Sequence, residues 1–234
     1  MSDYLAEIDK SGFAGLPGFI NKKQIEKLIK FSLELAKFSS SRKSKSIYGV
    51  RNLLHISSEI NELAESRKVK SVIGKILGRK AKPVRAIFFD KTPDVNWKVP
   101  WHQDLTISVK EKRETDGFTA WTSKANVQHV QPPVSLMEKM IALRIHLDDA
   151  DETNGALKVL PTSHQHGRLS ATDIQNLRRT IKPKVCSAEG GEAFLMRPLL
   201  VHSSSAGTSP KHRRVIHIEF SAEDLPNNLE WYGS

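Results

Sequence analysis

The sequence predicts a mostly β protein that begins with a helical part. From residue 84 onward, short segments rich in branched and aromatic residues follow one another, separated by Pro, Gly and Asn. Helix-like spacing of apolar residues is confined to the first third of the chain, apart from one segment at about 171–180. Successive strands without regularly alternating helices are typical of an antiparallel sandwich or barrel, and not of a Rossmann-type sheet.

The composition is that of one globular domain. The 234 residues are enough to bury a core, and we expect a basic helical part at 1–82, a β core at 83–222 and a C-terminal tail at 223–234. A single cysteine, Cys186, excludes a disulfide within the chain and is typical of a reducing compartment. The N-terminus carries charges where a secretory signal needs an apolar core, and no apolar run is long enough to span a membrane. We therefore expect a cytoplasmic protein.

The positive charge lies mainly at one end of the chain. Residues 1–84 hold 17 Lys or Arg and 8 Asp or Glu, whereas residues 85–234 hold 19 and 18. A basic part of this kind is compatible with nucleic acid, an acidic partner or an anionic substrate. The lysines are scattered and lack interleaved aromatic residues that stack on bases, so we favour a solvated helical surface and expect no nucleic-acid partner.

The helical periodicity begins after a segment punctuated by Gly and Pro. Asn21 is a candidate N-cap for a helix whose apolar stripe runs to Ala36. We expect a polar, basic loop at 39–46, then one or two helices within 52–78, the last ended by Gly78. The other apolar residues expected on helix faces are Ile25, Leu28, Ile29, Leu33, Leu53, Leu54, Ile60, Leu63, Val72, Ile73, Ile76 and Leu77.

The strands of the predicted core are short, and one long connection interrupts them. Residues 110–138 show no clear periodicity, and a connection of this length inside a compact domain usually has a function. We expect it to be a lid loop, on which Trp121 and His129 are candidate substrate contacts. The expected strands are 84–91, 101–109, 140–149, 156–161, 192–198, 199–205 and 213–221.

One pair of polar residues stands in a strand-like run. His102 and Asp104 are two positions apart, so on a strand their side chains project from the same face. An imidazole and a carboxylate, completed by a second imidazole, form the facial triad of non-haem iron(II) oxygenases. The pair alone is as compatible with a surface ion pair. His202, on a later strand, is the candidate second imidazole.

A candidate anchor for an anion follows on the last strand. Arg213 and His217 share one face of that strand, and the opposite face is mostly apolar. A guanidinium group binds a carboxylate through two parallel hydrogen bonds, which lysine does not reproduce. Ser204, two residues after His202, is a candidate for a third hydrogen bond. Arg214 is a rival anchor, but its place on the apolar face favours Arg213.

These motifs together resemble those of a known family. The stretches "GFAGLPGFI", "WHQD", "HLDDADETNGALKVLPTSHQHG" and "HSSSAGTSPKHRRVIHIEF" are similar to those of the phytanoyl-CoA dioxygenase family, which consists of iron(II)- and 2-oxoglutarate-dependent oxygenases. The resemblance extends over nearly the whole chain. It implies a double-stranded β-helix, which is a cupin-like jelly roll, behind N-terminal helices.

The resemblance also implies roles for particular residues. His102, Asp104 and His202 would bind iron(II), and Arg213 with Ser204 would hold the far carboxylate of 2-oxoglutarate. The further cofactors implied are dioxygen and, as a reductant, ascorbate. Halogenating relatives have a small residue at the carboxylate position, so Asp104 implies hydroxylation of a small organic substrate with release of succinate and carbon dioxide. Residues that would shape the cosubstrate pocket are Lys91 and Trp97.

Some alternatives stay open at this point. His146 and Asp148 repeat the His-x-Asp spacing, but the resemblance places them on a strand and turn before the "NGAL" segment, away from the metal. His217 either lines the pocket as a substrate contact or is a packed core histidine. Two other functions are an oxygenase that acts on a macromolecule such as nucleic acid, and a catalytically silent binding module with the same fold.

Overall fold

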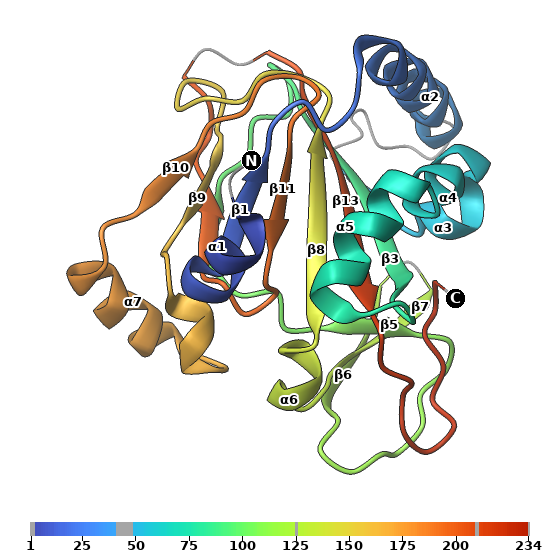
Figure 1. Cartoon of the computed structure of the whole chain (residues 1–234), viewed down its shortest axis with the longest axis vertical. Coiled ribbons are helices and arrows are strands. Elements are labelled where there is room, and N and C mark those ends of the chain that lie inside the picture. Colours follow the sequence, from blue (N-terminus) through green and yellow to red (C-terminus); the bar gives the residue numbers. More distant parts are fainter. Residues whose placement is uncertain (1–2, 41–48, 125, 209–210, 234) are drawn as a thin grey trace.

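The core of the protein is a pair of antiparallel β-sheets that face each other (Figure 1). The computed structural model describes residues 3–40, 49–124, 126–208 and 211–233. The larger sheet has the strand order β1-β11-β8-β13-β3-β2, and the smaller has the order β10-β9-β12-β4. A third sheet, β5-β7-β6, lies at one end of the molecule. This arrangement confirms the predicted jelly roll preceded by helices.

The strands are short, as expected. The large sheet consists of β1 (Phe13–Leu16), β2 (Gly49–Val50), β3 (Lys82–Lys91), β8 (Met140–His146), β11 (Ala193–Met196) and β13 (Arg213–Ser221). The small sheet consists of β4 (Val99–His102), β9 (Leu157–Val159), β10 (Lys184–Cys186) and β12 (His202–Ser204). The third sheet consists of β5 (Ile107–Val109), β6 (Thr119–Lys124) and β7 (Val127–Gln131).

Most of the helices precede the core. They are α1 (Tyr4–Ser11), α2 (Lys22–Ser40), α3 (Leu53–Ile56), α4 (Ser58–Ala64), α5 (Arg67–Leu77), α6 (Val134–Met137), the 3₁₀ helix η1 (Ser163–His166) and α7 (Ala171–Thr180). Asn21 caps α2 as predicted. Its Oδ1 accepts a hydrogen bond from the Gln24 backbone amide at 3.0 Å, and the Gln24 Oε1 accepts one from the Asn21 backbone amide at the same distance. Gly78 ends α5, and residues 171–180 form the predicted helix.

The two central strands of the large sheet separate an apolar layer from a polar one. Ile216, Ile218 and Phe220 of β13 pack outward into a core shared with helices α2 to α5. Arg213 and His217 face inward, toward the small sheet. The side chains of β8 alternate in the same way: one set packs in the outer core with the helices, and the other set faces the space between the sheets. The period-2 alternation of each strand therefore places charged side chains between the sheets.

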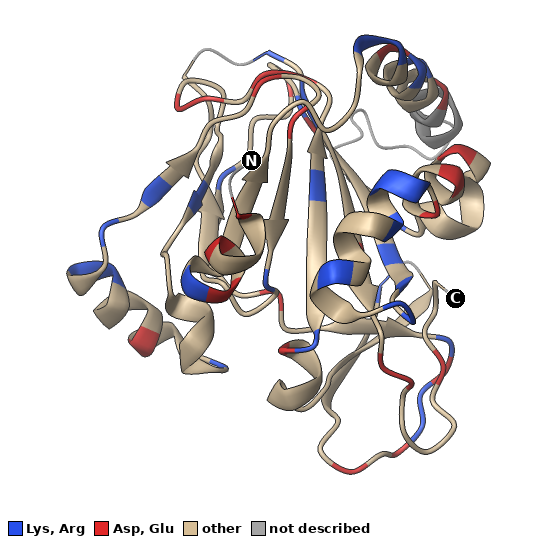
Figure 2. Cartoon of the chain, viewed as in Figure 1, with Lys and Arg blue, Asp and Glu red and all other residues tan. Residues whose placement is uncertain are grey.

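The N-terminal part is more than a helical layer. Its strand β1 pairs with β11, and its strand β2 pairs with β3, so it supplies both edges of the large sheet. Its basic helices carry acidic residues as well (Figure 2), and two ion pairs, Lys27–Glu62 and Lys70–Glu65, neutralise part of the charge. This interleaving of signs is typical of a solvated surface.

The segment 110–138 differs from the expected structureless loop. It contains the antiparallel pair of β6 and β7, which continues onto β5, and the short helix α6. β6 gave no periodic signal because it is an exposed edge strand with a bulge between Thr119 and Thr122. An edge strand without a buried face has no alternation of apolar and polar residues to detect.

Two predictions in the helical part need correction or lie outside the structure. Leu33, expected in the apolar stripe of α2, is 52% exposed. Helix α2 extends to Ser40, into the predicted loop at 39–46, and residues 41–48 lie outside the described part.

Cys186 is buried, as expected. Within the described residues, the helices are too short or too polar to cross a membrane.

Candidate metal and cosubstrate site

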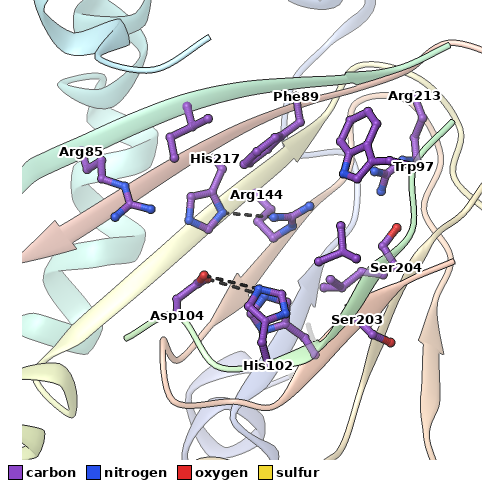
Figure 3. Close-up of a pocket in the computed structure, with 14 residues that line it drawn as sticks. Arg85, Phe89, Trp97, His102, Asp104, Arg144, Ser203, Ser204, Arg213 and His217 are labelled. Atoms are coloured by element: carbon purple, nitrogen blue, oxygen red, sulfur yellow. Dashed lines mark hydrogen bonds and ion pairs between the residues drawn. The ribbon is translucent and has the colours of Figure 1, made fainter. Parts of the chain in front are cut away.

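The structure brings His102, Asp104 and His202 together between the two sheets. His102 ends β4 and His202 begins β12, and the two residues are direct partners in the antiparallel register. Asp104 follows β4, and its carboxylate oxygens lie 3.8 Å from His102 Nε2 and 3.6 Å from His202 Nε2 (Figure 3). One ligand atom from each residue lies within 4.8 Å of the other two, and among the described residues this is the one such group found.

Both imidazoles are oriented by the backbone behind them. His102 Nδ1 donates to the Pro100 carbonyl at 2.8 Å, and His202 Nδ1 donates to the Leu200 carbonyl at 2.9 Å. These bonds place the proton of each neutral ring on Nδ1 and leave the Nε2 lone pair facing Asp104. A second-shell bond of this kind is usual for histidines that bind metals.

The charges of the three residues suit a divalent cation. Burial by itself would raise the pKa of the Asp104 carboxyl, but His202, His217 and His102 together lower it below its ordinary value. Burial lowers the pKa of His202 to about 4, against the attraction of Asp104. At neutral pH His202 is therefore neutral and Asp104 is ionised. Together with Nε2 of His102 they form a donor set that fits iron(II).

Gln103 holds this segment from behind. Its amide nitrogen donates to the carbonyls of Gly167 and Leu199 at 2.8 and 2.7 Å, and its carbonyl oxygen accepts the Leu169 amide at 2.8 Å. One buried side chain thus connects the segment between the two ligands to two separate loops.

We expect Gln103→Leu to lower iron(II) affinity by about tenfold, the lower end of what loss of outer-shell support costs. The substitution also leaves two carbonyls and one amide without partners, so the thermal midpoint falls. Calorimetric titration with metal and thermal denaturation measure the two effects. Gln165→Leu, which removes long bonds of an exposed amide, is the matched control. Unchanged metal affinity in Gln103→Leu would limit this residue to a structural role.

Arg213 lies at the other end of the same space. Its side chain is 3% exposed, and its Nε and Nη1 atoms are buried without a hydrogen-bond partner in the described part of the chain. Burial, together with nearby Arg144, lowers its pKa to about 10, so it stays charged at neutral pH. Arg214 points to the opposite face, where its Nε and Nη2 bind the Asp148 carboxylate at 2.8 and 2.7 Å. Of the two rival arginines, Arg213 therefore has free donors for an anion such as a 2-oxoglutarate carboxylate.

Ser204 and Lys91 form a buried pair beside this anchor. Lys91 Nζ donates to Ser204 Oγ at 2.7 Å and to the Ser205 carbonyl at 2.6 Å, and Ser204 Oγ donates to the Gly155 carbonyl at 2.8 Å. Gly155 has φ +79°, and a Cβ there would lie 2.4 Å from the Ser205 carbonyl oxygen. Burial, then Arg213 and Arg144, lower the pKa of Lys91 to about 7. Lys91 also lies over the Trp97 ring, 5.4 Å from its centroid.

A chain of charged residues forms the wall opposite the metal ligands. Arg144 Nη1 contacts His217 Nδ1 at 3.2 Å, His217 Nε2 contacts Glu219 at 3.3 Å, and Glu219 pairs with Arg85 at 3.2 Å. His217 thus lies in the pocket, as one of the two interpretations expected. Arg85 and Arg144 also line this cavity and were not predicted from the sequence. The sequence feature that could have indicated Arg144 is a charged residue inside an otherwise apolar strand, the stretch "MIALRIH" at 140–146.

The cavity between these groups has a volume of about 150 Å³. The metal ligands lie on one side of it, and Arg213 with Ser204 on another (Figure 3). Polar groups therefore converge on a small, partly open space, which is typical of a binding site. Its other lining residues are Arg85, Ile87, Phe89, Trp97, Val99, Arg144, Leu157, Ser203 and His217.

Two predicted substrate contacts lie elsewhere. His129 is buried in the three-stranded sheet, where its ring bonds to Ser108 Oγ at 3.1 Å and to the Val127 carbonyl at 3.0 Å. Trp121 packs at the edge of an apolar cluster of the same sheet. Neither lines the cavity. The rival histidine, His146, is fully buried beside Phe194 and is absent from the metal-ligand group of the described residues.

Comparison with solved structures agrees with this architecture. EctD from S. alaskensis, crystallised with 2-oxoglutarate and 5-hydroxyectoine, is 15% identical, with a TM-score of 0.73 over 94% of this chain and 76% of its own. AviO1 from Streptomyces viridochromogenes Tue57 is 20% identical, with a TM-score of 0.68 over 96% and 94%. The non-heme alpha ketoglutarate dependent epimerase SnoN from nogalamycin biosynthesis is 12% identical, with a TM-score of 0.68 over 96% and 89%. At these identities the similarity shows the fold.

The sequence itself gives the more specific comparison. No curated protein sequence matches the chain significantly. A family model described as phytanoyl-CoA dioxygenase (PhyH) matches residues 8–215, a range that contains the three candidate metal ligands and Arg213. The match confirms the resemblance, and with it an oxygenase class whose cofactors are iron and 2-oxoglutarate. The chain belongs to the phytanoyl-CoA dioxygenase family.

Proposed function

We propose that the protein hydroxylates a C–H bond of a small organic substrate while 2-oxoglutarate is converted to succinate and carbon dioxide. One observation carries this proposal. His102, Asp104 and His202, whose ligand atoms lie close enough together to hold a cation, share a cavity with Arg213, whose buried Nε and Nη1 have no partner among the described residues. A metal site and an anion site in one cavity are what binding of an oxoacid to iron requires.

The two ends of the cavity would bind different groups, the metal ion at one end and a carboxylate of 2-oxoglutarate at the other. His102, Asp104 and His202 would hold iron on one side and leave its remaining positions open. Arg213 would hold the far carboxylate of 2-oxoglutarate, and its planar group fixes the direction as well as the distance. Ser204 and Lys91 support this end, with the Ser204 proton directed to the Gly155 carbonyl.

The oxidising chemistry is supplied by iron, 2-oxoglutarate and dioxygen when they are bound, and the protein supplies geometry, charge and exclusion of water. Ile87, Phe89 and Leu157 provide apolar walls beside the metal ligands. A cavity of about 150 Å³ between two sheets fits a small molecule rather than a macromolecular surface. The segment 110–138 remains our proposed lid, although its described residues do not line the cavity.

Asp104 favours hydroxylation over halogenation. Its ionised carboxylate occupies the third protein position around the metal, beside both imidazole Nε2 atoms. A halide would need that position, and a small residue would have to stand there to admit it. The relatives of similar fold include a protein named as an epimerase, so the proposed outcome needs a direct test on products.

The test begins with the half-reaction that needs no known substrate. Purified protein with iron(II), ascorbate and 2-oxoglutarate labelled at its first carboxyl carbon is expected to release labelled carbon dioxide slowly. Asp104→Ala, which removes the charged ligand, is expected to abolish this release. Candidate small molecules are then screened for faster release, and products are analysed by mass spectrometry for one added oxygen atom.

The outcomes separate the enzyme class from the reaction. Iron and 2-oxoglutarate that bind without any carbon dioxide release would leave a silent binding module. Faster release with a product that has lost hydrogen or inverted a centre, and gained no oxygen, would keep the oxygenase class and overturn hydroxylation. Arg178→Gln, a loss of one surface charge on α7, serves as the control for general effects of substitution.

A further inference from the structure

The cavity contains a second arginine that the proposed cofactors do not use. Arg144 lies on the inner face of β8, 8% exposed, in the middle of the cavity wall (Figure 3). Its Nη1 contacts His217 Nδ1 at 3.2 Å, and its guanidinium lies 6.0 Å from the centroid of the Phe89 ring. Among the residues that the structure describes, its Nε has no hydrogen-bond partner.

The contact with His217 does not neutralise Arg144. A guanidinium only donates, so His217 Nδ1 accepts and the ring proton is on Nε2, which donates to Glu219 at 3.3 Å. His217 therefore supplies no negative charge to Arg144. The negative charge of Glu219 is matched by Arg85, whose Nη2 lies 3.2 Å from it. No carboxylate of the described residues lies within ion-pair distance of Arg144.

The proposed cofactors do not neutralise Arg144 either. Asp104 would be used by the metal, and 2-oxoglutarate has two carboxylates, of which one would bind the metal and the other Arg213. With the divalent ion, Asp104, 2-oxoglutarate and Glu219 counted against Arg85, Arg144 and Arg213, one positive charge remains, and Lys91, with a pKa of about 7, only adds to it. A buried charge without a partner is costly, which makes Arg144 a strong site for an added anion.

We propose that Arg144 binds a carboxylate group of the organic substrate. The inference rests on the proposed function and specifies its substrate class, an organic acid. The two-pronged guanidinium suits a carboxylate, and Phe89 and Leu157 next to it suit a short apolar part. A substrate held in this way would have its carbon chain beside the metal ligands across the cavity. Arg144 would thus determine specificity.

Acetate provides a minimal test that does not require the substrate. The protein is loaded with cobalt(II), a paramagnetic stand-in for iron(II), and with saturating 2-oxoglutarate, and the transverse relaxation of the acetate methyl protons is measured by NMR. Acetamide, which has the same shape without the charge, is the matched probe. We expect paramagnetic broadening about tenfold stronger for acetate than for acetamide, the low end of what a charge-assisted hydrogen bond contributes.

Three variants assign the effect to one side chain. Arg144→Gln is expected to remove the broadening of acetate, Arg144→Lys to keep part of it, and Arg178→Gln to leave it unchanged. Broadening that is equal for both probes, or that survives Arg144→Gln because acetate binds the metal directly, would overturn the proposal. A rise in the 2-oxoglutarate dissociation constant of Arg144→Gln without an acetate effect would instead assign Arg144 to the cosubstrate.

The measurement also separates this inference from the function on which it rests. Binding of cobalt(II) and 2-oxoglutarate is measured first, by calorimetry, on the same samples. If they do not bind, the proposed function fails. If they bind and acetate does not respond to Arg144, only the organic-acid substrate is excluded.

Discussion

His102→Ala is expected to lower iron(II) affinity by more than about 100-fold, since loss of an outer-shell partner alone costs about 10–100-fold and this change removes a ligand. His102 Nε2 and His202 Nε2 both face the Asp104 carboxylate, and two ligands hold a cation far less well than three. Release of carbon dioxide from labelled 2-oxoglutarate is expected to disappear as well. Calorimetric titration with iron(II) under anaerobic conditions measures the affinity.

His146→Leu is the matched control, because His146 belongs to the second His-x-Asp pair. Its ring is fully buried, burial lowers its pKa to about 3, and neither ring nitrogen has a hydrogen-bond partner in the described structure. An apolar residue of similar size should therefore fit without loss of metal affinity, and the thermal midpoint is expected to hold or rise. Iron affinity that survives His102→Ala and falls with His146→Leu would mean that the wrong pair has been assigned.

Arg213→Met is expected to raise the 2-oxoglutarate dissociation constant by about 100-fold or more, in line with the roughly 3–5 kcal/mol lost when one partner of a buried ion pair is removed. Iron affinity is expected to stay the same. Because Nε and Nη1 of Arg213 are unpaired and buried without a ligand, the variant should also be at least as stable as the parent protein when 2-oxoglutarate is absent. Titration of the metal-loaded protein and thermal denaturation test both effects.

Arg214→Met should give the opposite pattern. Arg214 makes two side-chain bonds to Asp148 and its guanidinium points away from the cavity, so 2-oxoglutarate affinity should remain. The partly buried Asp148 carboxylate would lose its charged partner and keep only the backbone amide of residue 214, so the thermal midpoint should fall. If 2-oxoglutarate affinity falls in Arg214→Met and holds in Arg213→Met, the neighbouring arginine is the anchor.

Much of the fold was predictable because its signals are local. The capping pair of Asn21 and Gln24, the Gly78 that ends α5 and the alternation in β13 each depend on a few adjacent residues. The hairpin of β6 and β7 was not predicted, because it lacks such a local signal. Its first strand is exposed, and a strand without a buried face has no local pattern that marks it.

The candidate metal ligands and the candidate anchor could be predicted from the sequence, whereas the other residues of the cavity wall could not. The His-x-Asp spacing, His202 and Arg213 stand in motifs that resemble a family, and the structure gathers them around one cavity. Trp121 and His129 lie on a long segment whose length favours a role at the site, but neither residue lines the cavity. Position along a segment does not fix the distance to a site.

The sequence by itself indicated the family and, through that resemblance, the oxygenase class and the three candidate metal ligands. Strand parity placed Arg213 on one face of β13, because alternation is a property of the chain. Only the tertiary structure decided which charges have partners. Arg214 meets Asp148, Arg85 meets Glu219, and Arg144 meets no carboxylate of the described residues. These pairings join residues far apart in the chain, and the free energy of a buried charge depends on its neighbours in space.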